Sequence, residues 1–241
     1  MYIFWLLLYG FIYITSGFLS RQLDRPYIFF VLFILLYWGA FLYILHRKGR
    51  WEMYGICLPK QFPVSSVRLS AAAFLFAAAN LLSDGTVGLA EWTELRWIEA
   101  AARFLEITLL VWGEEVFFRG FLPEFLSDRI GQTPGQWGAI LLFALMHLVN
   151  LVQGENRGYI LLQTICAFVF GLLLWLLRSQ SGSLLPGTIL HMLVNLTAGT
   201  VTSSGSGTVM TAGQVIISLI AAGAGLAVSI YEGRTDRKIR N

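Results

Sequence analysis

Long apolar stretches, separated by short polar segments, divide the chain into candidate membrane-spanning helices. A helix needs about 20 mostly apolar residues to cross the hydrocarbon core of a bilayer. Stretches of roughly this length recur along the whole sequence, and Pro or Gly residues mark several of their ends. The pattern predicts an all-α, polytopic transmembrane helical bundle of about eight helices. The expected helices cover about 2–20, 27–45, 65–82, 96–126, 137–152, 159–177, 184–198 and 209–231.

Composition agrees with a membrane protein. Of the 241 residues, 56% are hydrophobic and only 13% are charged, and the mean hydropathy is +0.68. A soluble domain carries about 25% charged residues. No polar linker or block of charge divides the chain, so we expect a single integral membrane domain over 1–241. The net charge of +3 is typical of basic loops beside a lipid bilayer, and we expect no nucleic-acid partner.

The first apolar segment and the basic residues predict the orientation. Segment 2–20 lacks a basic start and an Ala-x-Ala cleavage site, so we expect a retained helix and not a signal peptide. With eight spans both termini share one side, and most Lys and Arg residues fall on that side. The positive-inside rule then places both termini in the cytoplasm. We expect a multi-pass protein, located in the cell membrane if the organism is bacterial.

Three polar motifs interrupt the apolar stretches. A charged side chain at membrane depth costs about 2.5–3.5 kcal/mol on insertion scales, so such residues favour a functional interpretation. Two carboxylates, one Arg, two His and one Asn are buried in this way, which suggests hydrolysis in an intramembrane polar cavity. The motifs are Glu114-Glu115-x-x-x-Arg119, Phe143-x-x-x-His147 and His191-x-x-x-Asn195.

The first motif separates two carboxylates by function. Glu115 and Arg119 are four residues apart, so they share a helix face and can form an ion pair. Glu114 is rotated about 100° from Glu115 and can point into a cavity as a general base. A simpler alternative stays open, in which Glu115 and Arg119 only neutralise each other and Glu114 extends to the cytoplasmic surface of the membrane.

The other two motifs supply nitrogen donors. His191 and Asn195 are four residues apart, so both can reach one cavity, and Asn150 follows His147 by one turn and is expected to orient its ring. Two His and Glu114 could ligate zinc with an open position for water. Equally, they could hold a water without metal, with His and Asn donating to an oxyanion. Cys57 lies in a polar segment and Cys166 in an apolar one, so we expect neither a disulfide between them nor a thiolate metal site.

The ordered set of motifs resembles the CPBP family, which comprises the CAAX prenyl endopeptidases and the bacterial CAAX proteases and bacteriocin-processing enzymes. The resemblance covers about 97–198. It implies an eight-helix intramembrane endopeptidase whose cavity opens to the cytosol and whose substrate is a peptide or protein, which can be membrane-associated. The family has been described both as metalloproteases and as metal-independent glutamic proteases. We favour the second, with no cofactor, and zinc held by Glu114, His147 and His191 remains the alternative.

The resemblance also implies a role for each motif residue. Glu114 and His147 would activate water, and His191 and Asn195 would stabilise the oxyanion. Glu115 and Arg119 would shape and charge the site.

Two functions from other classes stay open. Some relatives of the resembled family are labelled as bacteriocin-immunity or partner-recruiting membrane proteins, so a non-proteolytic binding protein is one alternative. A proton-coupled transporter is the other, because buried Glu and His residues also build proton relays. The sequence shows no internal repeat and no pair of broken helices, which disfavours a transporter.

Overall fold

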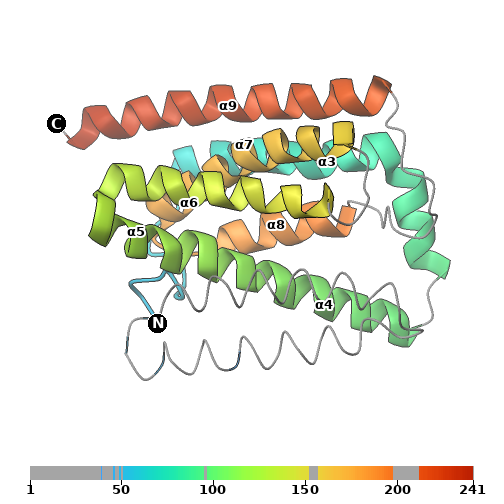
Figure 1. Cartoon of the computed structure of the whole chain (residues 1–241), viewed down its shortest axis with the longest axis horizontal. Coiled ribbons are helices and arrows are strands. Elements are labelled where there is room, and N and C mark those ends of the chain that lie inside the picture. Colours follow the sequence, from blue (N-terminus) through green and yellow to red (C-terminus); the bar gives the residue numbers. More distant parts are fainter. Residues whose placement is uncertain are drawn as a thin grey trace.

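The computed structural model describes residues 51–94, 97–151, 157–197 and 212–240, together with Gly39, His46 and Gly49. The expected helix at 2–20, and that at 27–45 apart from Gly39, lie outside the described residues. All regular structure in the described ranges is helical, as predicted. In chain order the elements are α3 (Val64–Glu94), α4 (Trp97–Glu115), the π-helix η1 (Val116–Phe121), α5 (Leu122–Ile130), α6 (Gln132–Met146), the 3-10 helix η2 (His147–Leu151), α7 (Arg157–Ser181), α8 (Leu185–Thr197) and α9 (Ala212–Arg240), as drawn in Figure 1.

The expected helix at 96–126 shows the largest difference between sequence pattern and structure. The chain stays helical from Trp97 to Ile130, but Val116–Phe121 forms a π-helix between α4 and α5. All residues of this π-helix are buried, and an apolar run with one Arg gives no local sign of a changed pitch. π-helical turns are frequent at functional sites. This one begins directly after the two adjacent glutamates of the first motif.

Other helix bounds differ less. α3 continues to Glu94, beyond its expected end at 82, although Ser83-Asp84-Gly85 has the composition of a turn. Local propensity is a weak prior that longer-range contacts override. α6 begins at Gln132, before the expected start at 137, and changes to a 3-10 helix at His147. The helices expected at 159–177, 184–198 and 209–231 correspond to α7, α8 and α9.

A tight turn reverses the chain between α5 and α6. Gly131 alone separates the two helices and has φ of +90°, a backbone conformation that glycine adopts without steric cost. Its N–H donates to the carbonyl of Ser127 at 3.0 Å. A Cβ atom on Gly135 would lie 2.5 Å from the nitrogen of Ser127, so the absence of a side chain there lets α5 and α6 pack closely.

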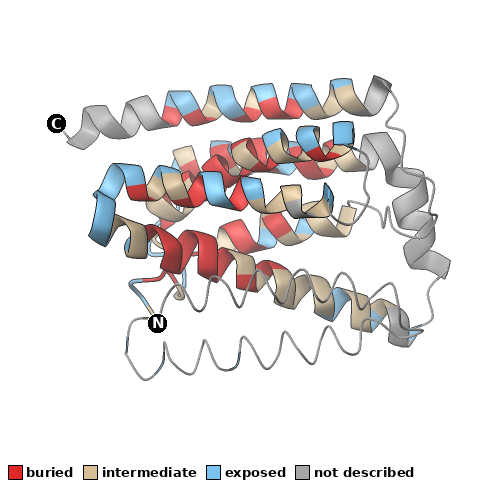
Figure 2. Cartoon of the chain, in the orientation of Figure 1, coloured by how far each residue is buried: buried red, intermediate tan, exposed pale blue. Residues whose placement is uncertain are grey.

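α7 is the central helix of the described bundle. It packs against α3, α6, α8 and α9, and in Figure 1 it lies between α9 at one edge and α4 at the other. Its Leu173, Leu174 and Leu177 are fully buried, and Figure 2 shows buried residues along much of its length. α8 packs against α3, α4 and α7. This packing brings the polar residues of α4 and α8 together inside the bundle.

Two described helices are long and apolar enough to cross a membrane, namely Arg157–Ser181 and Val215–Glu232. Shorter apolar helical segments cover Val64–Asn80 and Leu185–Thr197. The α9 segment exposes apolar side chains such as Ile216, and Figure 2 shows that burial on this helix is confined to one side. Such a helix suits contact with lipid on its outer face.

Candidate active site

An ion pair between Glu115 and Arg119 lies at the junction of α4 and η1. Glu115 is the last residue of α4, and Arg119 lies within η1. Their side chains are 1% and 2% exposed, and Nη1 of Arg119 lies 3.0 Å from Oε1 of Glu115. The predicted pair is therefore present. Because it is removed from solvent, loss of either partner would leave the other charge buried and uncompensated.

His191 of α8 contacts both adjacent glutamates. Its Nδ1 donates to Oε1 of Glu115 at 2.7 Å, and its Nε2 lies 3.5 Å from Oε2 of Glu114. The imidazole is almost completely buried, whereas the side chain of Glu114 retains 13% of its exposure. A carboxylate bonded to Nδ1 fixes the orientation of the ring and directs Nε2 to the other side. The more accessible carboxylate therefore faces the nitrogen that Glu115 leaves available.

Phe143 of α6 packs among the polar groups of the site. The guanidinium carbon of Arg119 lies 3.7 Å from the ring centroid of Phe143, a cation–π contact. The same ring makes edge contacts with the imidazoles of His147 and His191, at centroid distances of 5.4 and 5.8 Å. A Cβ atom on Gly171 of α7 would lie 3.1 Å from Phe143 Cδ1 and 3.3 Å from Arg119 Nη2. The missing side chain at Gly171 thus makes room for this packing.

His147 is the first residue of η2, directly after α6. Its Nδ1 donates to the carbonyl of Phe143 at 3.2 Å, which leaves Nε2 for another partner. The imidazole is close enough to Arg119 and His191 to interact with both electrostatically. The structure therefore brings His147 into the same region of the bundle as the first and third motifs.

Asn150 takes part in a different contact from the expected one. Its amide nitrogen donates to Oε1 of Gln163 on α7 at 3.2 Å, whereas His147 is held by a backbone carbonyl. The described contacts therefore tie η2 to α7 and show no bond through which Asn150 would orient the imidazole.

Asn195 lies one turn beyond His191 on α8 and is partly buried. The end of α8 is held by a residue that the motif analysis missed. Nδ2 of Asn80 on α3 donates to the carbonyl of Val194 at 3.1 Å. The only available sequence signal was a single amide that follows three alanines in an apolar stretch. Phe143 was part of a motif, but its contacts with both histidines follow only from the packing of α6 against η1 and α7.

Among the described residues, no group of three or more His, Cys, Asp or Glu side chains is arranged to hold a metal ion. The nearest arrangement is the contact of His191 with both glutamates. A carboxylate on Nδ1 of a histidine is also common beside zinc ligands. The donor types thus suit zinc, whereas their spacing in the structure is that of an ion-pair and hydrogen-bond cluster.

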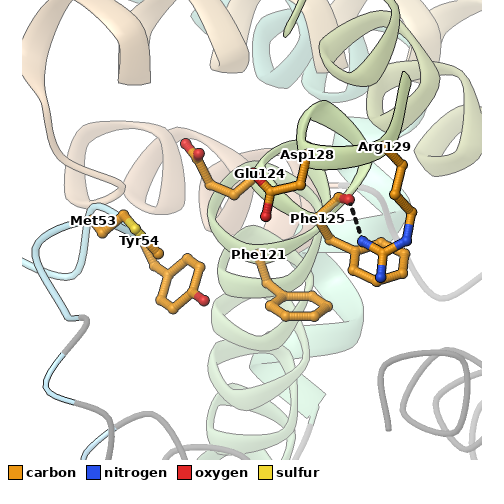
Figure 3. Close-up of a pocket in the computed structure, with 7 residues that line it drawn as sticks. All are labelled: Met53, Tyr54, Phe121, Glu124, Phe125, Asp128 and Arg129. Carbon is orange, nitrogen blue, oxygen red and sulfur yellow. Dashed lines mark hydrogen bonds between the residues drawn. The ribbon is translucent and has the colours of Figure 1, made fainter. Parts of the chain in front are cut away.

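A separate pocket of about 670 Å³ lies beside α5. Figure 3 shows its walls, where Met53 and Tyr54 of the loop before α3 face side chains from η1 and α5. In the close-up the guanidinium of Arg129 lies over the ring of Phe125. None of the described residues that line this pocket belongs to the three motifs, so it is distinct from the candidate active site. The lining residues are Met53, Tyr54, Phe121, Glu124, Phe125, Asp128 and Arg129.

A cluster of carboxylate, imidazole and guanidinium groups is thus buried inside a bundle of apolar helices. Residues 96–197 match the family model described as type II CAAX prenyl endopeptidase Rce1-like. The segment that ends with α8 is therefore similar to that family, and the match confirms the resemblance indicated by the motifs. The family implies intramembrane CAAX protease activity and a peptide or protein substrate. No curated protein and no solved structure matches the chain.

Proposed function

We propose that the protein is an intramembrane endopeptidase that hydrolyses a peptide bond with a water activated by Glu114 and His147. The observation that carries the proposal is the position of His191 between Glu114 and Glu115, with Arg119 paired to the second carboxylate. This arrangement supports different functions for the two glutamates. Glu115 contacts Arg119 and His191, whereas Glu114 is the more accessible acid and would transfer the proton.

In the proposed reaction, Glu114 accepts a proton from water as the water oxygen attacks the carbonyl carbon of the substrate. The imidazole of His147 helps to hold that water, because its Nδ1 is engaged with a backbone carbonyl and Nε2 is left for it. The carbonyl oxygen becomes an oxyanion. When the C–N bond breaks, Glu114 returns the proton to the leaving amine, and the other product is a carboxylic acid.

His191 and Asn195 would stabilise the oxyanion. Nδ1 of His191 donates to Glu115, so its Nε2 and the amide of Asn195 are the groups on this face of α8 that would donate to the oxyanion. Glu115 would fix the orientation of the imidazole, as the buried carboxylate does in a catalytic triad. Arg119 then balances the charge of Glu115 and keeps its carboxylate in place.

Zinc hydrolysis through Glu114, His147 and His191 is the alternative mechanism. There the metal would polarise the carbonyl and activate the water. Both mechanisms need the same three residues, so substitution alone does not separate them. We favour the metal-independent one, because His191 already has a glutamate oxygen near each ring nitrogen.

The proposed setting is a single membrane domain over 1–241, with about eight helices around an intramembrane polar cavity. We infer that the protein is multi-pass and that both termini are cytoplasmic, since basic residues concentrate on that side. Single-cysteine variants at 47–50 and 153–156, which the sequence predicts to lie on opposite sides of the membrane, would test this orientation with a membrane-impermeant thiol reagent. Labelling of both segments from the same side would contradict it.

Direct cleavage of a defined peptide tests the proposed activity. Purified protein in detergent would be mixed with a farnesylated peptide that ends in a CAAX sequence and with the same peptide lacking the farnesyl group. We expect hydrolysis of an internal peptide bond, located by mass spectrometry. Absence of cleavage of both peptides would contradict the endopeptidase proposal. It would favour the non-proteolytic binding protein, as would a Glu114→Gln variant that keeps full biological function.

A further inference from the structure

The C-terminal end of α8 is stabilised from outside the helix. The structure describes α8 as far as Thr197, and the carbonyl of Val194 lies in the last described turn. Nδ2 of Asn80 donates to it at 3.1 Å and lies 3.4 Å from Oγ1 of Thr197. The Thr197 hydroxyl lies 2.8 and 3.0 Å from the carbonyls of Leu193 and Val194 and can donate to either.

These contacts surround Asn195. The residue before it carries the carbonyl that Asn80 holds, and Thr197 is two residues after it. The side chain of Asn195 leaves the helix in this same turn. A displacement of about 1 Å in a group that acts on the transition state can lower the rate up to 10²-fold. The position of the Asn195 amide thus depends on how firmly this turn is fixed.

We propose that Asn80 is a positioning residue, which holds the last turn of α8 and thereby aims Asn195 at the substrate oxyanion. The inference rests on the proposed function, because it assumes that Asn195 acts on the oxyanion. Asn80 belongs to α3, outside the segment 96–197 that matches the protease family. The catalytic domain would therefore depend on a hydrogen bond from a helix that carries none of the three motifs.

Asn80 is partly buried, and its surroundings support a specific role. Its neighbours on α3 include the buried Ala77 and Ala79, and α3 packs directly on α8. An amide in an apolar helix interface costs free energy unless its hydrogen bonds are made. Apolar residues would pack α3 against α8 without that cost. Asn80 adds directional donors at a carbonyl in the last described turn of α8, next to Asn195.

The test is a double-mutant cycle between Asn80→Ala and Asn195→Ala, with kcat and KM measured on the farnesylated CAAX peptide. We expect Asn80→Ala to lower kcat by about 10-fold to 10²-fold with little change in KM. In the Asn195→Ala background the same substitution should change kcat by no more than about twofold, because the group it positions is already gone.

Ser66→Ala is the matched control. Ser66 is a buried polar residue of the same helix, and its hydroxyl donates to Oε1 of Gln180 at 3.1 Å, away from the end of α8. Loss of this bond should lower thermal stability but leave kcat unchanged. Thr197→Val supplies an isosteric second variant that removes a hydroxyl from the helix end. It should lower kcat in the same non-additive way, even if Asn80→Ala does not fold.

The kcat values of these variants test the role of Asn80 and the role of Asn195 separately. Equal kcat values for Asn80→Ala, Thr197→Val and Ser66→Ala would overturn the positioning role. So would full additivity of Asn80→Ala with Asn195→Ala, since the two residues would then act separately. If Asn195→Ala itself leaves kcat unchanged, the oxyanion assignment in the proposed mechanism falls as well. If Asn195→Ala lowers kcat and Asn80→Ala does not, the mechanism stands and only the role of Asn80 is rejected.

Discussion

Nδ1 of His191 lies 2.7 Å from Oε1 of Glu115, and this hydrogen bond joins α8 to the end of α4. The two residues are 76 positions apart in the sequence, yet both are nearly excluded from solvent. The carboxylate that pairs with Arg119 is thus the same one that fixes the imidazole. Charge balance and ring orientation therefore depend on a single side chain.

Glu115→Gln should lower kcat by about 10²–10⁴-fold, because a neutral amide does not hold the imidazole of His191 in one tautomer. It should also reduce thermal stability, since Arg119 would lose its buried counter-charge. Peptide cleavage and thermal unfolding of the purified variant measure the two effects. Glu52→Gln changes an exposed carboxylate of the loop before α3 and serves as the control. A Glu115→Gln enzyme with wild-type kcat would remove Glu115 from the account.

Arg119→Ala should destabilise the fold by about 3–5 kcal/mol, because Glu115 would remain buried without its partner. Arg119→Lys should restore only part of this loss. Lysine keeps the charge, but it lacks the planar guanidinium that lies over Phe143. Unfolding by SDS titration would give the order wild type, Lys, Ala. Wild-type stability of Arg119→Ala would show that the ion pair contributes nothing to the fold.

Gly171→Ala should disturb the site without altering any polar group. The added Cβ would press against Phe143 and Arg119, and overpacking of this kind typically costs about 1–3 kcal/mol. We expect a lower melting temperature together with a lower kcat. Gly223→Ala on α9 is the matched control, because nothing lies within 4 Å of its added Cβ. If both alanine variants behave alike, close packing at Gly171 is irrelevant to the site.

Metal chelation separates the two mechanisms. The metal-independent mechanism predicts that prolonged dialysis against a zinc chelator leaves kcat unchanged and that metal analysis finds less than one zinc per chain. The zinc mechanism predicts loss of activity and its recovery on adding zinc, since the three ligands would hold the ion that activates water. Recovery that depends on zinc would overturn our preference for a glutamic-type reaction.

The helical class and the approximate positions of the described helices followed from the sequence, because a bilayer restricts spanning segments to long apolar helices. The pairing of Glu115 with Arg119 followed from their spacing on one helix. Such local relationships depend only on helical geometry.

Features that depend on tertiary packing could not be predicted. The π-helix at Val116–Phe121 has no sequence signal, because its apolar residues suit an α-helix equally well. The contact of His191 with both glutamates requires the packing of α8 against α4. The contact of Asn80 was even harder to predict, because its partner is a backbone carbonyl, a group that every residue has.

The most direct test of the central claim is kcat of Glu114→Gln on the farnesylated CAAX peptide, measured beside wild type and Glu52→Gln. The substitution keeps the size of the side chain and removes its ability to accept a proton from water. We predict that kcat falls by at least about 10²-fold, the usual contribution of a general base, while the melting temperature stays near that of wild type. Glu52→Gln should cleave as wild type does. A Glu114→Gln enzyme that turns over at the wild-type rate would contradict the account, because Glu115, the adjacent carboxylate, is paired with Arg119 and His191.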